Sequence, residues 1–496
     1  MRPNTTHEVT LSRIADDLGL PAPLDVAVSG VSADNRLIHP GDLFVASRGE
    51  TVHAAKFARS AIDAGAVGVL TDAEGADIIG EVDVPKLVVK DPAGIAGKVA
   101  SIVYGNPSAA LTTFGITGTN GKTSTAFMID LLLRQLGRMT GLIGTVSVKI
   151  GDDVVPSALT TPQPVDLQAM LATLVERGGS DLIVEVSSHA LEQKRTDPVR
   201  FDVVGFTNLT QDHLDYHGTI EEYFNAKAIL FDTEHSVRGV VTVDDDAGQR
   251  LYDQANAERP GAIVSLSLTG KDADWSVTSD GQKFTLEGPG GILTSHTDLP
   301  GAFNVANAAL ALVMVIESGV NLATLGEAIA QVGVSPVIPG RMEVVGSRPY
   351  TVVDFAHNTD ALEKAMLALK DRGFRRLIVV TGSAGDRDRG KRPMMAAVVA
   401  EHADHLVVTD DDPHSEDPAQ IRREVIAGIA EGFSWEEIGD REQAIRSAIR
   451  DAHDDDVVLI AGRGHETIQD VAGDAIEIDD RVVARDALAH RMAENS

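Results

Sequence analysis

The chain of 496 residues is 43% hydrophobic and 24% charged, and it carries a formal net charge of −31. The length predicts about three domains, and the acidic balance excludes a protein that binds nucleic acid through its phosphates, because such proteins concentrate Lys and Arg. Cysteine is absent, which excludes a disulfide framework and thiolate catalysis. The sequence has no apolar run long enough for membrane insertion and no apolar signal core in MRPNTTHEVTLSR, so we expect a cytoplasmic protein.

Residues 1–108 have the pattern of a small α/β domain. A short apolar strand in GDLFVAS is followed by the helical pattern KFARSAIDAGA and by a second strand, VGVLTD. The next segment, YGNPSAALTT, contains Gly, Pro and Ser, so we expect the first domain boundary there.

Residues 109–337 predict a second α/β domain. The strand LTTFGIT leads through a glycine loop into the helix TSTAFMIDLLLRQL, and apolar strands follow at DLIVEV and FDVVGFTNL. This alternation predicts a parallel sheet. The segment VSPVIPGR, near residue 338, marks the second boundary.

Residues 338–496 predict a third α/β domain. Strand–loop–helix units start at YTVVDFAHN, RRLIVVTGS and DHLVVTDDD, and a last strand, DDVVLIAGRGHE, closes the series. In open α/β sheets, ligands bind outside the carboxyl ends of the strands, and the polar clusters of this chain repeatedly follow strand ends. We therefore expect the functional residues in these loops.

The loop GITGTNGKT predicts a nucleotide site of unusual build. The common phosphate loop has four residues between its first glycine and Gly-Lys-Ser/Thr, but Ile116 stands where that glycine belongs. Glycines let successive N–H groups point inward, and the following helix contributes its positive end. Lys122 can then reach the terminal phosphates and Thr123 can ligate Mg²⁺. The alternative, a plain glycine turn, does not account for GKT between a strand and a helix.

Acidic and imidazole side chains at strand ends are candidate Mg²⁺ ligands. Glu185 ends the strand DLIVEV, although the serines after it also suit a helix cap, and both can hold together. His213, in TNLTQDHLDYHG, is close in sequence to Asp212, Asp215 and His217. This pattern leaves metal ligation and a structural role for His213 equally open. For Lys227, in the helix EEYFNAKAILF, spacing alone indicates a solvated side chain.

Together these segments resemble the Mur ligases over nearly the whole chain. The matching motifs are DNRLIHPGDLFVA, GITGTNGKT, LTTPQP, EVSSHALEQKR, TNLTQDHLDYHG, YFNAKAILF, LPGAFNVANAALA, PGRMEVV, VDFAHNTDAL, GDRDRGKRPMM, DDPHSEDP and AGRGHE. The shortened loop is this family's own form of the phosphate loop.

The resemblance implies a three-domain, ATP-dependent ligase of peptidoglycan precursor synthesis. The first domain would hold the uridine end of a UDP-N-acetylmuramoyl dipeptide, the second ATP, and the third, Rossmann-like, the incoming amino acid. Reaction would proceed through an acyl phosphate, with two Mg²⁺ ions and a carbamate on Lys227. A monomer without nucleic-acid partners is expected.

The same resemblance implies roles for individual residues. Lys122, Lys227 and His213 would be catalytic, and Thr123, Glu185, His213 and Lys227 would bind metal. The nucleotide would contact Gly118, Thr119, Asn120, Gly121, Lys122, Thr123, Ser124, Asn304, Asn307, Arg341, Asp354 and His357. The substrates would contact Asn35, Glu50, Thr51, Val52, Thr160, Thr161, Ser187, Gln193, Arg195, Arg387, Asp411, Asp412, Pro413, His414, Gly462 and Glu466.

The motif Asp411-Asp412-Pro413-His414 bears on the amino acid. The diaminopimelate-adding type has Asn and Arg where this chain has Asp412 and His414, and Arg is suited to bind a distal carboxylate through paired donors. We therefore expect L-lysine or L-ornithine, with meso-diaminopimelate as the alternative if the surrounding acids keep His414 protonated. Two other functions stay open: folylpolyglutamate synthetase, which has a similar loop, and a phosphate-loop ATPase that acts as a regulatory switch.

Overall fold

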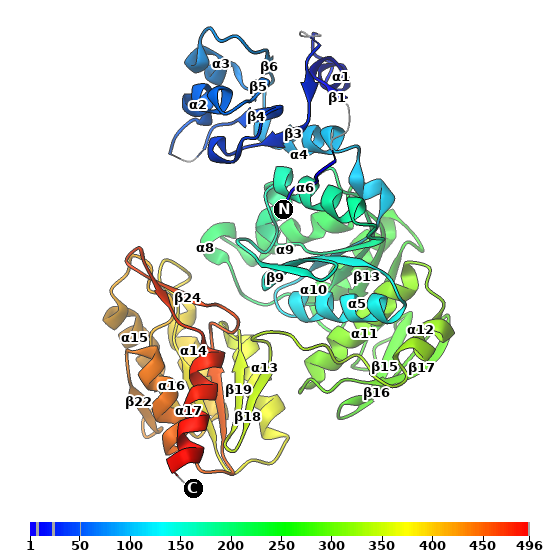
Figure 1. Cartoon of the computed structure of the whole chain (residues 1–496). Helices are drawn as coiled ribbons and strands as arrows, with labels where there is room; N and C mark the ends of the chain where they lie inside the picture. The colour runs from blue at the N-terminus through cyan, green and yellow to red at the C-terminus, as the bar shows by residue number, and fades with distance from the viewer. Residues whose placement is uncertain (6–8, 22–24, 50, 495–496) are drawn as a thin grey trace.

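The computed structural model describes residues 1–496 except 6–8, 22–24, 50 and 495–496. Three α/β units follow one another along the chain, and Figure 1 shows the N-terminal unit (blue) above the central unit (cyan to green), with the C-terminal unit (yellow to red) beside it. The α/β class and the three-domain organisation are therefore as predicted. None of the described helices is both long and apolar enough to cross a membrane.

The N-terminal unit is built on a parallel sheet in the order β3-β4-β5-β6. Its strands are β3 (Gly30–Ser32), β4 (Asp42–Ala46), β5 (Gly68–Thr71) and β6 (Lys86–Val88), with a small pair β1 (Val9–Thr10) and β2 (Ala27–Val28). The helices are α1 (Leu11–Asp17), α2 (Ala58–Asp63), α3 (Ala73–Ile79) and α4 (Pro92–Val103). The expected helix at KFARSAIDAGA is a 3₁₀ turn (Ala54–Phe57) followed by the short α2.

The central unit contains a mixed sheet in the order β10-β9-β8-β11-β7-β12-β13-β14-β15-β16-β17. The strands are β7 (Thr112–Thr117), β8 (Thr140–Ile143), β9 (Ser147–Ile150), β10 (Asp153–Pro156), β11 (Asp181–Glu185), β12 (Phe201–Phe206), β13 (Ser236–Thr242), β14 (Ile263–Ser267), β15 (Trp275–Asp280), β16 (Lys283–Gly288) and β17 (Gly291–His296). The helices are α5 (Lys122–Gln135), α6 (Pro164–Glu176), α7 (Ser188–Glu192), α8 (Leu214–His217), α9 (Ile220–Ala228), α10 (Asp246–Glu258), α11 (Ala302–Glu317) and α12 (Leu322–Ile329).

The middle of this sheet is covered on both faces. Phe114 and Ile116 of β7 pack into a core with α5 and α11, whereas Leu182 and Val184 of β11 pack into the core on the opposite face. Burial on both faces explains why these strands read as continuous apolar runs. The outer strands β9, β10, β16 and β17 are antiparallel and were not predicted. Exposed residues in β10, β16 and β17 give no continuous apolar run, and the mostly buried β9 contains Ser147 and Lys149 within four residues.

The C-terminal unit has a sheet in the order β18-β19-β23-β20-β21-β22, parallel except for β18. The strands are β18 (Glu343–Ser347), β19 (Tyr350–Asp354), β20 (Leu377–Thr381), β21 (His405–Val408), β22 (Trp435–Glu437) and β23 (Val457–Ala461). The helices are α13 (Thr359–Lys370), α14 (Lys391–His402), α15 (Pro418–Ile426), α16 (Arg441–Asp451) and α17 (Asp480–Glu494). The prediction that β23 ends the series was wrong, because the hairpin of β24 (Ile468–Val471) and β25 (Asp474–Glu477) follows it.

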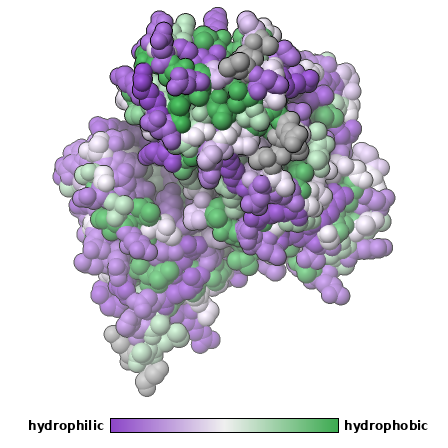
Figure 2. All heavy atoms as spheres, turned by 45° about the horizontal axis from the view of Figure 1, so that its top comes forward, coloured by the Kyte–Doolittle hydropathy of each residue, from purple (hydrophilic) through white to green (hydrophobic). Residues whose placement is uncertain are grey.

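Strand order places the functional loops. In the central sheet, β7 lies between β11 and β12, and in the C-terminal sheet β23 lies between β19 and β20, so the chain changes direction at these points. The loops after the carboxyl ends of these strands face the space between the two units. Mainly hydrophilic residues (purple in Figure 2) cover the visible surface of the C-terminal unit, as its acidic sequence leads one to expect.

Candidate functional site

The phosphate loop connects β7 to α5 through two glycines in left-handed conformation. Gly118 has φ 143° and Gly121 has φ 92°. A Cβ atom on Gly118 would lie 1.8 Å from Thr207 Oγ1, and one on Gly121 would lie 2.4 Å from Asn307 Oδ1. Only glycine fits both positions. No side chain caps the start of α5 at Gly121, so the first N–H groups of the helix are available to an anion.

Two lysines converge on this loop. Lys122 Nζ donates to the carbonyl oxygens of Gly118 and Thr119, each at 2.9 Å, and Lys227 Nζ donates to the same Gly118 oxygen at 2.8 Å. Burial lowers the pKa of both amines, and for Lys227, whose pKa lies well below its usual value, the nearby charge of Lys122 adds to the effect. The ring of Tyr223 covers Lys227 Nζ at 4.3 Å. The interpretation of Lys227 as a solvated residue, based on spacing, was wrong.

Glu185 lies beside the loop because β11 pairs with β7 in parallel, with Glu185 opposite Ile116. Its fully buried carboxylate accepts hydrogen bonds from Thr123 Oγ1 at 2.9 Å and from Thr145 Oγ1 and N, each at 3.0 Å. The carboxylate of Glu185 and the hydroxyls of Thr123 and Thr145 thus cluster at the first turn of α5. Ser187 also caps α7 by accepting from Ala190 N at 3.2 Å, so the cap and the acidic site coexist.

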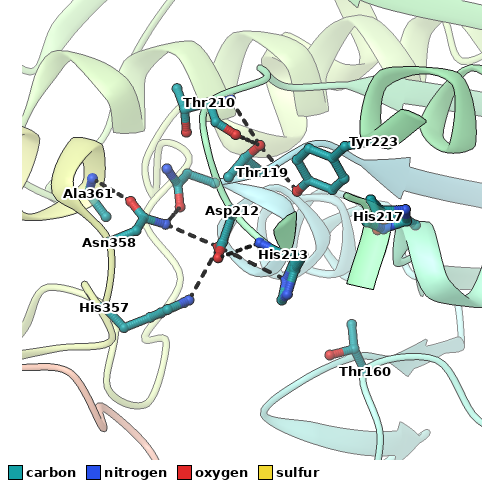
Figure 3. Close-up of polar contacts among 12 residues, drawn as sticks. Thr119, Thr160, Thr210, Asp212, His213, His217, Tyr223, His357, Asn358 and Ala361 are labelled. Carbon is teal, nitrogen blue, oxygen red and sulfur yellow. Dashed lines mark hydrogen bonds and ion pairs between the residues drawn. The ribbon is translucent and has the colours of Figure 1, made fainter. Parts of the chain in front are cut away.

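Asp212 connects the central unit to the C-terminal unit, as Figure 3 shows. Its carboxylate accepts from Asn358 Nδ2 at 3.3 Å and lies 3.5 Å from His357 Nε2 and 3.9 Å from His213 Nε2. Burial opposes ionisation, but the hydrogen bond and charge of His357 hold the pKa of Asp212 well below its usual range. The sequence did not identify Asp212 or Asn358 as site residues.

His213 has the left-handed backbone of a constrained site residue, with φ 54°. Burial lowers its pKa to about 3, although the charge of Asp212 opposes this shift. The ring is therefore neutral near pH 7 and can use a nitrogen lone pair. His189 packs edge-on against it, with the ring centroids 5.1 Å apart.

Arg341 brings a further cation from the C-terminal side. Its guanidinium donates to Thr123 Oγ1 at 3.3 Å and lies 4.0 Å above the Phe355 ring. Asp354 accepts from the N–H groups of Met342 and Ala356, and burial raises its pKa. The predicted nucleotide residues Asn304, Asn307, Asp354 and His357 line the same cavity, as do Thr119, Asn120, Gly121, Lys122, Thr123 and Ser124.

An acidic pocket follows β21 and β23. Carboxylate oxygens of Asp411, Asp412 and Glu466 lie within 4.8 Å of one another. Burial, followed by the charges of the two aspartates, raises the pKa of Glu466 to about 8. Arg463 is buried and donates to Asp412 Oδ1 and to Ile468 O. A Cβ atom on Gly462 would lie 2.6 Å from Asp411 Oδ2, so the backbone passes close to this carboxylate.

One cavity of about 1150 Å³ includes both groups. It is lined by the phosphate loop, Glu185 and His213 from the central unit, and by Arg387, Asp411, Asp412, His414, Gly462 and Glu466 from the C-terminal unit. Thr160 and Ser187 also line it, whereas Gly118, Thr161, Gln193, Arg195, Lys227 and Pro413 do not. Thr161 and Arg195 lie just behind, since Thr161 accepts from Ser187 N and Arg195 donates to Thr161 O.

Of the N-terminal candidates, Asn35, Thr51 and Val52 do not line this cavity. Asn35 donates to Ser60 Oγ at 3.3 Å, and Thr51 and Val52 are exposed. Glu50 lies outside the described residues.

The comparisons with known proteins agree along the chain. Residues 27–104 match the model "Mur ligase family, catalytic domain", residues 116–315 match "Mur ligase middle domain", and residues 340–464 match "Mur ligase, glutamate ligase domain". The UDP-N-acetylmuramoyl-L-alanyl-D-glutamate--2,6-diaminopimelate ligase of Streptomyces avermitilis is 42% identical over 98% of both chains. The UDP-N-acetylmuramyl-tripeptide synthetase of Leifsonia xyli subsp. xyli is 42% identical over 93% of this chain and 92% of its own. A solved UDP-N-acetylmuramoyl-L-alanyl-D-glutamate--2,6-diaminopimelate ligase is 30% identical, with a TM-score of 0.66, covering 99% of this chain and 100% of its own.

Proposed function

Because the chain belongs to the Mur ligase family of ATP-dependent, amide-forming enzymes, we propose that it joins a diamino acid to UDP-N-acetylmuramoyl-L-alanyl-D-glutamate. The observation that carries this proposal is the single cavity onto which the phosphate loop and the acidic C-terminal pocket both open. The product would be a precursor of peptidoglycan, made in the cytoplasm by a monomeric enzyme.

The chemistry needs ATP because a carboxylate does not react usefully with an amine, since its leaving group would be oxide. Transfer of the γ-phosphoryl group to the substrate carboxylate gives an acyl phosphate, which the amine attacks with phosphate as the leaving group. The protein must position two anions that repel each other and neutralise their charge. Lys122, Arg341 and the free N–H groups of α5 are suited to this task.

Mg²⁺ would supply further positive charge between the γ-phosphate and the carboxylate. The donor set fits a hard cation, because Thr123 and Glu185 present oxygen atoms and the ring of His213 is neutral. Lys227 fits carbamate formation, which requires a neutral amine, because burial holds its pKa well below the usual value. We therefore propose Thr123, Glu185, His213 and carbamylated Lys227 as the metal-binding residues.

The remaining assignments extend this proposal. Residues 1–108 would bind the uridine end through Asn35, Glu50, Thr51 and Val52, and residues 109–337 would bind ATP. The sugar-peptide part would contact Thr160, Thr161, Ser187, Gln193 and Arg195. Residues 338–496 would bind the amino acid through Arg387, Asp411, Asp412, Pro413, His414, Gly462 and Glu466.

The amino acid has three candidates: meso-diaminopimelate, L-lysine and L-ornithine. The names of the Streptomyces avermitilis relative and of the solved ligase both specify 2,6-diaminopimelate, so the comparisons favour the alternative, meso-diaminopimelate, over L-lysine or L-ornithine. The name of the Leifsonia xyli relative specifies no amino acid. The pocket of this chain favours L-lysine or L-ornithine, because Asp411 and Asp412 suit a side-chain ammonium and would repel a distal carboxylate. Glu466 adds to this preference when it ionises at a pH of about 8. These two amino acids differ by one methylene, which is worth about 1–3 kcal/mol of discrimination.

The test is mass spectrometry of the product formed from the UDP-muramoyl dipeptide, ATP and meso-diaminopimelate, L-lysine and L-ornithine supplied together. A tripeptide supports the ligase, and its mass identifies the amino acid. ATP turnover that is independent of any amino acid would instead favour the regulatory ATPase. Ligation of glutamate to a folate would favour folylpolyglutamate synthetase, against which the match of residues 27–104 to a Mur ligase model argues.

A further inference from the structure

The hairpin β24–β25 is bound directly to the loop that we propose for the amino acid. His414 N donates to Asp470 O at 3.0 Å, and Ala472 N donates to His414 O at 2.8 Å. Asp470 N also donates to Asp412 Oδ1 at 3.1 Å, and Gln469 Nε2 donates to Asp411 O. The hairpin therefore fixes the backbone of residues 411–414, although it lies more than 50 residues further along the chain.

The side chain of Asp470 also orients the imidazole of His414. His414 Nδ1 lies 3.0 Å from Asp470 Oδ2, while Asp470 Oδ1 accepts from Gly473 N at 2.9 Å. Since a carboxylate only accepts, Nδ1 must carry the proton, and in a neutral ring the lone pair is then on Nε2. His414 Nε2 has no hydrogen-bond partner among the described residues, and His414 lines the cavity whereas Asp470 does not.

The carboxyl groups that line the cavity with His414 suit the side-chain ammonium of a ligand, and Arg387, which lines the same cavity, suits its α-carboxylate. Asp411, Asp412 and Glu466 line the same pocket, and the nearby cation Arg463 is buried and already bonded to Asp412 and Ile468 O. The hydroxyl of Ser383 also lines the cavity, is almost fully buried and lacks a hydrogen-bond partner in the described structure. The pocket thus offers acceptors to a ligand that carries donors.

We infer that Asp470 is a positioning residue for amino-acid specificity, which holds His414 so that Nε2 accepts a hydrogen bond from the side-chain ammonium of the incoming diamino acid. This inference rests on the proposed function. It concerns a contact that would select lysine or ornithine over an amino acid with a distal carboxylate. In the opposite case, a doubly protonated His414 would donate from Nε2 to that carboxylate.

The experiment compares Asp470→Ala and Asp470→Asn with Asp474→Ala. Asp474 is exposed on the same hairpin, and its side chain has no hydrogen bond within the described part of the chain, so it controls for the loss of one negative charge. In Asp470→Asn the amide oxygen can still accept from Nδ1–H, while the NH2 group takes the place of the oxygen that accepts from Gly473 N. This variant therefore retains the hydrogen bond to His414 and loses the charge and the bond to Gly473. The measurements are the tautomer of His414 by ¹⁵N NMR, assigned with His414→Gln, and kcat and KM for lysine, ornithine and diaminopimelate.

We expect Nδ1–H in the wild type and in Asp470→Asn, and its loss in Asp470→Ala. Asp470→Ala should raise KM for lysine or ornithine about tenfold, as for the loss of one hydrogen bond to a charged group, while kcat and KM for ATP stay within about twofold. Asp474→Ala and Asp470→Asn should resemble the wild type.

Two results would overturn the inference. One is Asp470→Ala with the wild-type tautomer and the wild-type KM. The other is a wild-type enzyme that prefers diaminopimelate and has a doubly protonated His414, together with a KM for the amino acid that rises as much in Asp470→Asn as in Asp470→Ala. Failure of the proposed function is distinct, since the wild type would then form no tripeptide with any of the three amino acids.

Discussion

Replacing Lys122 with Met should separate catalysis from stability. The Met side chain keeps most of the apolar stem and removes the ammonium that donates to the Gly118 and Thr119 carbonyls. Loss of a charged group that faces the transferring phosphoryl group should lower kcat about 100-fold or more. Ligation in Lys122→Met should therefore be close to background.

The effect on stability should be small because two contributions oppose each other. Two hydrogen bonds are lost, each worth about 1 kcal/mol. Burial lowers the pKa of Lys122, so holding the protonated form in this site is unfavourable, and the substitution relieves that penalty. Because the pKa of Lys122 is lower in the folded protein than in the unfolded chain, the buried ammonium destabilises the folded state wherever the unfolded lysine is protonated. That pH range includes pH 7. We expect the unfolding midpoint to change by about 3 °C or less.

The assay is tripeptide formation and thermal unfolding of the same preparation, with Lys86→Met as the control. Lys86 is a lysine of the N-terminal unit that donates to Gly80 O, far from the loop in sequence. Turnover within about threefold of the wild type would refute the role of Lys122, since a catalytic cation is worth far more. A fall of about 10 °C in the midpoint would attribute the loss of activity to unfolding.

Three further changes test other parts of the site. Lys227→Ala should reduce turnover about 100-fold or more, with partial rescue by small carboxylates. ¹³C NMR with labelled bicarbonate should detect a carbamate only in the wild type, and a wild type without this signal would contradict the modification. Gly121→Ala should weaken ATP binding and lower the unfolding midpoint, because its Cβ would lie 2.4 Å from Asn307 Oδ1. The control is Gly137→Ala, since Gly137 also has a positive φ but has open space around it; equal effects of the two variants would show that backbone strain alone is responsible. Since the pKa of Glu466 is raised to about 8, its carboxylate ionises as pH increases through that value, and kcat/KM for the amino acid should rise with it. This rise in kcat/KM should be absent in Glu466→Gln; a rise of the same size in that variant would assign it to another group.

The parts of the site that belong to one strand–loop–helix unit could be predicted from the sequence. The phosphate loop is recognisable because Gly118 and Gly121 are required by local backbone conformation. Glu185 was predicted as a ligand at a strand end, and the parallel pairing of β11 with β7 brings it to Thr123. Both arguments use only neighbouring residues and the general geometry of parallel sheets.

Contacts between units could not be predicted in the same way. Asp212 meets Asn358 and His357 only because the C-terminal unit packs against the loop after β12, and no periodicity encodes that packing. The burial of Lys227 beneath Gly118 depends equally on how α9 packs. Asp470 contacts His414 through a hairpin whose short strands, partly exposed, gave no strand pattern.

The central claim is that ATP activates the dipeptide carboxylate as an acyl phosphate in the cavity between the two units. The most direct measurement uses UDP-N-acetylmuramoyl-L-alanyl-D-glutamate with ¹⁸O in the reacting carboxylate and follows the label by mass spectrometry of the released phosphate. The account predicts one ¹⁸O atom in phosphate for each tripeptide formed, because the carboxylate oxygen leaves with the phosphoryl group. Tripeptide formed with no label in the phosphate would contradict it.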